Sequence, residues 1–127
     1  MTLETANSKL DEGAEYETFK ENRSEEVRVT VDPGICGFVC RIRGQKDGKQ
    51  VSFDIASECK QIQKLALELG TVHMKDLFVP LTRSPIFLIA EKTRCHLACP
   101  IPSSLVKAAE VVLGLALPKD ASLRFSA

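Results

Sequence analysis

The hydrophobic period of the sequence changes once, at about residue 56, and this change limits the folds that the chain can adopt. Between residues 27 and 55 apolar side chains alternate with polar ones, as in strands that bury one face. From residue 57 onward they recur every three to four positions, as in amphipathic helices. Strands first and helices later predict an α+β fold: an antiparallel sheet of three to four strands with three to four helices packed on one face.

Three alternating runs, at 27–31, 37–43 and 50–55, predict the strands of an antiparallel meander. Pro33-Gly34 and Asp47-Gly48 are turn signals between these runs. The residues predicted to point inward are Val27, Val29 and Val31 in the first run, Phe38, Cys40 and Ile42 in the second, and Val51, Phe53 and Ile55 in the third.

Helical periods follow at 57–70, 83–95 and 103–117, and the segment 73–80 predicts a further short helix. Ser57 and the pair Ser84-Pro85 are start signals for the first two of these helices. The residues predicted on the buried faces are Ile62, Leu65, Ala66 and Leu69, then Ile86, Ile89 and Ala90, then Leu105, Ala108, Ala109 and Val112.

The two ends of the chain differ from the part between them. Residues 1–26 hold eight acidic side chains against three basic ones and show no sustained period, which predicts an acidic, mostly disordered lead. Residues 27–127 are then expected to form a single α+β domain. At the other end, Leu123 and Phe125 alternate with polar neighbours, so the segment 120–127 predicts a last short strand.

Charge and hydropathy exclude two classes of partner. The chain has no net charge, and its basic residues are scattered rather than clustered, so we expect no binding to nucleic acid. No apolar run approaches the roughly 20 residues of a membrane span, and the first residues lack the pattern of a signal peptide. These absences predict a cytoplasmic protein, in which the five cysteines stay reduced rather than forming a disulfide framework.

The cysteines occupy different kinds of position. Cys36 follows the Pro-Gly turn of the stretch DPGICGFVC, whereas Cys40 has the inward parity of its strand and is predicted to be a small buried residue. Cys59 falls in the first turn of a predicted helix and Cys99 just precedes another, where the helix dipole stabilises a thiolate. We therefore predict that Cys36, Cys59 and Cys99 form a three-sulfur site, provided that the fold brings them together.

Cys95 and His96 lie at the end of a predicted helix and offer a fourth ligand for zinc or an iron–sulfur cluster. The spacing between Cys95 and Cys99 repeats that between Cys36 and Cys40. Zinc modules most often have two residues between paired cysteines rather than three, and the usual iron–sulfur runs are absent. Core packing without any ligand therefore stays open as an alternative.

Several stretches resemble an uncharacterised family of small cytoplasmic proteins found mostly in anaerobic bacteria and archaea. These stretches are DPGICGF, SEC, CPIP and KAAEVVLGLALPKD, and the resemblance covers residues 28–125. It implies that Cys36, Cys59 and Cys99 match cysteine positions of the family, whereas Cys40 and Cys95 do not. It implies no activity, but an anaerobic setting would suit free thiols and soft-metal chemistry.

Three functions follow from these observations. The first is binding of a soft metal or metal cluster through thiolates, and the second is a thiol-based redox protein or enzyme in which Cys59 or Cys99 attacks. The third is an interaction domain whose cysteines pack in the core. Such a domain binds an unknown protein partner or forms a homodimer through an open sheet edge. The sequence contains no GxGxxG, Walker, HExxH or GxSxG motif, so the common nucleotide-binding, zinc-protease and serine-hydrolase classes are not expected. Whether the chain is an enzyme stays open.

Overall fold

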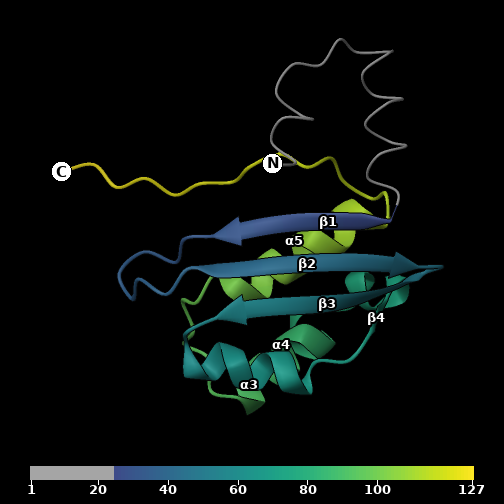
Figure 1. Ribbon diagram of the computed structural model, residues 1–127, viewed down its shortest axis with the longest axis horizontal. Helices are drawn as coiled ribbons and strands as arrows, with labels where there is room; N and C mark the ends of the chain where they lie inside the picture. The colour runs from purple at the N-terminus through teal and green to yellow at the C-terminus, as the bar shows by residue number, and fades with distance from the viewer. Residues whose placement is uncertain (1–24) are drawn as a thin grey trace, which may run out of the picture.

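In the computed structural model, which describes residues 25–127, four antiparallel strands form one sheet (Figure 1). The strands are β1 (Glu26–Val31), β2 (Cys40–Asp47), β3 (Gln50–Ser57) and β4 (Val72–His73), and they lie in the sheet in that order. The first three form the predicted meander. β4 is only two residues long and pairs with the start of β3, so that Val72 lies opposite Val51.

The helices cover the apolar face of this sheet. They are α3 (Lys60–Glu68), α4 (Pro85–Lys92) and α5 (Ile101–Val112), with short 3₁₀ turns at η1 (Met74–Phe78) and η2 (Leu81–Arg83). α5 packs against β1 and β2, while α3 packs against β3 (Figure 1). The α+β class with helices on one face of an antiparallel sheet is therefore confirmed.

Strand register explains which side chains form the core. Val29 lies opposite Ile42, which in turn lies opposite Ile55, so the apolar parity of the three strands coincides. The predicted faces of α3 and α5 pack against the sheet, and α4 packs against α3 and α5. The buried side chains common to these faces are Val27, Cys40, Ile42 and Val51 from the sheet and Ile62, Leu65, Ile86, Ala90, Leu105, Ala108, Ala109 and Val112 from the helices.

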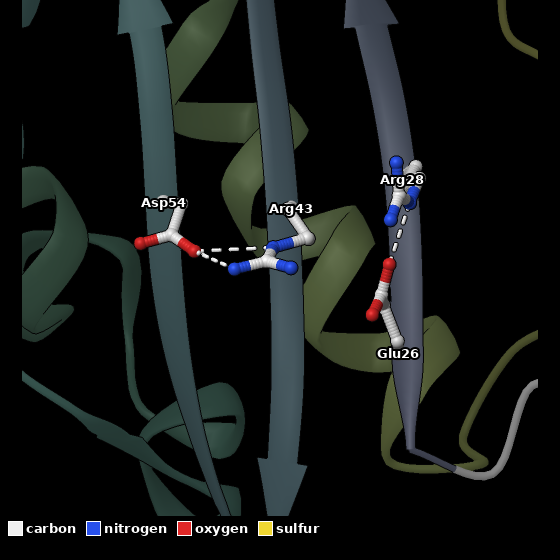
Figure 2. A network of polar contacts seen from close by, with 4 residues as sticks. All are labelled: Glu26, Arg28, Arg43 and Asp54. Carbon is white, nitrogen blue, oxygen red and sulfur yellow. Dashed lines mark hydrogen bonds and ion pairs between the residues drawn. The ribbon is translucent and has the colours of Figure 1, made fainter.

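The opposite face of the sheet is polar and carries ion pairs (Figure 2). Arg43 lies directly across from Asp54, and its Nε donates a hydrogen bond to Asp54 Oδ2 at 3.1 Å. Arg28 forms an ion pair with Glu26 on its own strand. Because Arg28 also lies across from Arg43, the two carboxylates offset what would otherwise be a like-charge pair.

The expected strand at 120–127 is not formed, and this prediction is wrong. These residues have no regular secondary structure, and Leu123 and Phe125 are 90% and 95% exposed. An alternating pattern specifies a strand only where a neighbouring strand accepts its hydrogen bonds and a core accepts its apolar face. The short β4 takes the fourth place in the sheet instead, next to β3.

The start of the second strand also differs from its prediction. β2 begins at Cys40, because a loop precedes it in which Gly37 N–H donates to Gly34 O and Val39 N–H donates to Gly37 O. Phe38 therefore lies outside the strand and is 44% exposed rather than buried.

Two predicted helix starts shift by a few residues. Cys59 rather than Ser57 occupies the N-cap position of α3, and the Ser57 hydroxyl accepts a hydrogen bond from Cys59 N–H at 3.1 Å. α5 begins at Ile101, earlier than predicted, because Pro102 suits the first turn of a helix. At α4 the prediction is correct: Ser84 Oγ accepts a hydrogen bond from Phe87 N–H. The acidic lead predicted for residues 1–26 lies, up to residue 24, outside the described residues.

Candidate thiol site

The fold brings Cys40 and Cys59 to the same end of the sheet. Cys40 is the first residue of β2 and lies opposite Ser57, the last residue of β3. Cys59 follows Ser57 by two residues and is held there by the hydrogen bond from its N–H to the Ser57 hydroxyl. Cys40 is completely buried in the core, as predicted, whereas Cys59 is half-buried at the edge of the core.

Cys95 and Cys99 approach the same core from the loop between α4 and α5. Both are half-buried and pack against the cluster that contains Cys40. Cys95 Sγ lies 3.7 Å from Thr93 Oγ1, just after the end of α4. Cys99 precedes α5, and the backbone N–H of Ile101 donates a hydrogen bond to its sulfur. The predicted position of Cys99 before a helix is confirmed.

Cys36 lies on an exposed turn beside this region. It sits between Gly34 and Gly37, whose φ values of 91° and 76° fall in the left-handed region that favours glycine. Asp32 Oδ1 accepts a hydrogen bond from Gly34 N–H at 3.1 Å and fixes the start of the turn. A Cβ placed on either glycine would meet no atom within 4 Å, so space surrounds this turn. Its glycines therefore serve the turn conformation rather than close packing.

The pKa values of Cys40 and Cys99 respond to neighbouring cysteines. Burial, together with the nearby Cys99 and Cys59 thiolates, raises the pKa of Cys40 to about 11. Burial also raises the pKa of Cys99. The hydrogen bond from the Ile101 N–H lowers this pKa in part, whereas the charges of Cys95, Cys59 and Cys36 raise it further. The five cysteines, which come from four separate segments, form a group in which each lies within electrostatic range of Cys40 or Cys99. We call it the cysteine cluster.

Residues 25–127 contain no group of three or more Cys, His, Asp or Glu side chains arranged to hold a metal ion. The predicted sulfur ligands Cys36, Cys59 and Cys95 lie within electrostatic range of Cys99, but the described residues form no coordination shell. His96 is exposed, and its carbonyl accepts the Cys99 N–H at 3.2 Å. The other histidine, His73, is the N-cap residue of η1, and its backbone N–H donates a hydrogen bond to Asp76 Oδ2 at 2.9 Å.

Two polar partners of the cysteines were not predicted. Gln61 Oε1 accepts a hydrogen bond from Cys59 Sγ at 3.5 Å, and Thr93 contacts Cys95 as described above. In each case a polar residue lies two positions from a cysteine. Whether two residues at this spacing meet depends on the backbone conformation between them. The spacing alone therefore does not predict such a contact.

The fold and the cluster define the class of protein: a small α+β domain with a thiol-rich end. Residues 27–125 match the model of a family described as "Family of unknown function (DUF6951)", so the chain belongs to that family. This confirms the resemblance to an uncharacterised family inferred from the sequence. No curated protein and no solved structure matches the chain. Within the described part of the chain, no helix is both long enough and apolar enough to cross a bilayer.

Proposed function

We propose that this protein binds a soft metal ion or a metal cluster through the thiolates of Cys36, Cys59 and Cys99. Cys95 or His96 is the fourth ligand. The observation that carries the proposal is that cysteines from four separate segments lie within electrostatic range of Cys40 or Cys99. Soft thiolate ligands suit zinc, copper(I) and iron–sulfur centres.

The charges within the cluster favour a cation over free thiolates. Each thiolate makes the next one harder to form, as the shared effect on the pKa of Cys99 and Cys40 indicates. A bound cation reverses this repulsion, because a coordinating thiol loses its proton to solvent and its charge is then neutralised by the metal. A cytoplasmic, reducing setting would keep the thiols available for this reaction.

Binding must also change the geometry, because the described side chains do not form a complete ligand set. Cys36 is the ligand best able to move, since its turn is exposed and open space surrounds both of its glycines. Cys59 and Cys99 are half-buried at the edge of the core and provide the fixed part of the site. In this proposal the metal draws the Cys36 turn toward those two sulfur atoms.

Cobalt(II) titration tests the proposal, because thiolate coordination gives strong charge-transfer and ligand-field absorption. We expect saturable binding by the wild-type chain and a large loss of these bands in Cys36→Ser, Cys59→Ser and Cys99→Ser. Cys40→Ala is the matched control, since its sulfur lies within the core and is not among the proposed ligands. Equal absorption in all four variants and the wild type would contradict the proposal.

A thiol–disulfide exchange function is the second candidate, and the exposure of Cys36 favours it. In that reaction the Cys36 thiolate attacks a disulfide of a partner protein and forms a mixed disulfide. Cys99 then attacks the Cys36 sulfur, which releases the partner's second thiol and leaves a Cys36–Cys99 disulfide. The raised pKa of Cys99 disfavours it as the first nucleophile at neutral pH. Alkylation rates near neutral pH distinguish the candidates: exchange predicts one cysteine that reacts much faster than the others.

A further inference from the structure

α3 and α4 are neighbouring helices (Figure 1). A shallow groove of about 240 Å³ lies between α3 and the end of α4. Three cationic side chains, Lys64, Lys92 and Arg94, line it together with one carboxylate, that of Glu68. Lys92 Nζ is paired with Glu68 Oε1 at 2.8 Å. Among residues 25–127, no ion pair joins Lys64 or Arg94 to a carboxylate, so two cations of the groove have no anionic partner.

The backbone of Arg94 is a second, independent observation. Its φ of 64° makes it the sole residue other than glycine with a positive φ in the described part of the chain. Arg94 follows α4 at the position where helices usually end with glycine: Cys95 N–H donates to Ala90 O, and Arg94 N–H donates to Glu91 O. An arginine here lowers stability relative to glycine, because a side chain is disfavoured at a positive φ.

We propose that this groove binds a small molecule through an anionic oxygen group, a phosphate or a carboxylate. The planar guanidinium of Arg94 supplies paired donors for such a group, and Lys64 supplies a second positive charge. The volume is below the 300 Å³ or so at which drug-sized ligand sites begin, so the groove accommodates a head group rather than a whole nucleotide.

The groove adjoins the cysteine cluster but does not depend on it. Two further lining residues, Gln61 and Thr93, are the polar partners of Cys59 and Cys95. A ligand in the groove would therefore contact residues that in turn contact two of the cysteines. The proposal goes beyond metal binding, and its test needs no metal, so the two proposals can fail separately.

Calorimetric titration of the full chain with pyrophosphate, and separately with citrate, tests this site at constant ionic strength. We expect saturable binding of at least one anion, and the stronger of the two identifies the oxygen group. Lys64→Ala and Arg94→Gly should each weaken binding about tenfold, while Arg94→Lys, which keeps the charge, should weaken it less. Lys107→Ala, an exposed cation on α5 outside the groove, is the control and should bind as the wild type does.

Arg94→Gly should change stability and anion binding in opposite directions. Removing a side chain from a positive-φ position should raise Tm by about 2–4 °C, even as anion binding falls. The proposal is overturned if neither anion gives saturable binding. It is also overturned if Lys64→Ala and Arg94→Gly bind like the wild type, or if Lys107→Ala loses as much affinity as they do.

Discussion

The core between the sheet and the helices and the cysteine cluster at its end are built in different ways. In the core, most buried apolar side chains lie on a regular strand or helix, and their direction follows from the period of that element. In the cysteine cluster, the sulfur atoms come from a turn, a strand end, a helix cap and a loop. The core is therefore specified by local pattern, whereas the cluster exists only once those distant segments have packed together.

This difference predicts that the residues that determine stability are not the ones that bind metal. Cys40 and Cys36 are four residues apart, yet one is completely buried and the other lies on an exposed turn. We expect changes in the core to alter the free energy of unfolding and changes at the edge of the cluster to alter metal binding. The predictions below test that division, from the largest expected effect to the smallest.

Leu105→Ala should have the largest effect, because Leu105 is fully buried where α5 packs on the sheet. Loss of its contacts and the cavity left behind should lower the free energy of unfolding by about 2–5 kcal/mol, as measured in urea. Leu123→Ala is the matched control and should change it by less than about 0.5 kcal/mol, because Leu123 is exposed. A large loss in Leu123→Ala would show that the tail does pack as a strand.

Alkaline pH should weaken the core through Cys40. Because its folded-state pKa of about 11 lies above the ordinary value of 9.0, its contribution to stability is complete below about pH 9 and is lost as the pH rises through 11. The difference of about two pKa units corresponds to roughly 3 kcal/mol. Cys99, whose pKa is also raised, should add to the same trend.

Urea unfolding between pH 8 and 11 measures this effect. The free energy of unfolding of Cys40→Ala should decline less steeply with pH than that of the wild type. This difference isolates the effect of the Cys40 thiol from that of the lysines, which titrate in the same range. Parallel curves for the two proteins would mean that Cys40 is not protected by burial.

Serine replacements should affect stability differently at the two cysteines of the stretch DPGICGFVC. Cys40→Ser places a hydroxyl in an apolar core and should lower the free energy of unfolding by about 1–3 kcal/mol. Cys36→Ser should change it by less than about 0.5 kcal/mol, because that side chain is exposed. Unfolding of the metal-free proteins in urea checks both values, and a similar loss in the two variants would remove the contrast.

The polar face of the sheet should give the smallest effect. Asp54→Ala leaves Arg43 beside Arg28 without its carboxylate and should lower the free energy of unfolding only slightly, because the pair is exposed to solvent. The loss should shrink in 1 M salt, which screens charges at this exposed surface. A double-mutant cycle with Arg43→Ala isolates the pair, and an effect independent of salt would argue against an electrostatic cause.

The sequence predicted the elements whose partners are close along the chain. The parity of β1 to β3 and the faces of α3, α4 and α5 follow from periods of two and 3.6 residues. The start signal Ser84-Pro85 was equally local, and Ser84 does cap α4. The segment 120–127 had a comparable pattern but no neighbouring strand, and no local signal reveals whether an edge is available.

The cysteine positions were predictable one at a time, but their mutual approach was not. Burial of Cys40 followed from strand parity, and the place of Cys99 before a helix followed from the prolines. The approach of Cys59 to Cys40 depends instead on the β2–β3 register, and that of Cys99 on how α5 packs against β1 and β2. Such distances are set by tertiary packing and have no period in the sequence.

Metal analysis of the native protein tests the central claim most directly. The chain would be purified without oxygen and without a metal-binding tag, then measured by elemental analysis and absorption spectroscopy. The account predicts near-stoichiometric zinc, copper or iron in the wild type and in Cys40→Ala, with most of the metal lost in Cys36→Ser. A colourless, metal-free wild-type protein with five titratable thiols would contradict it.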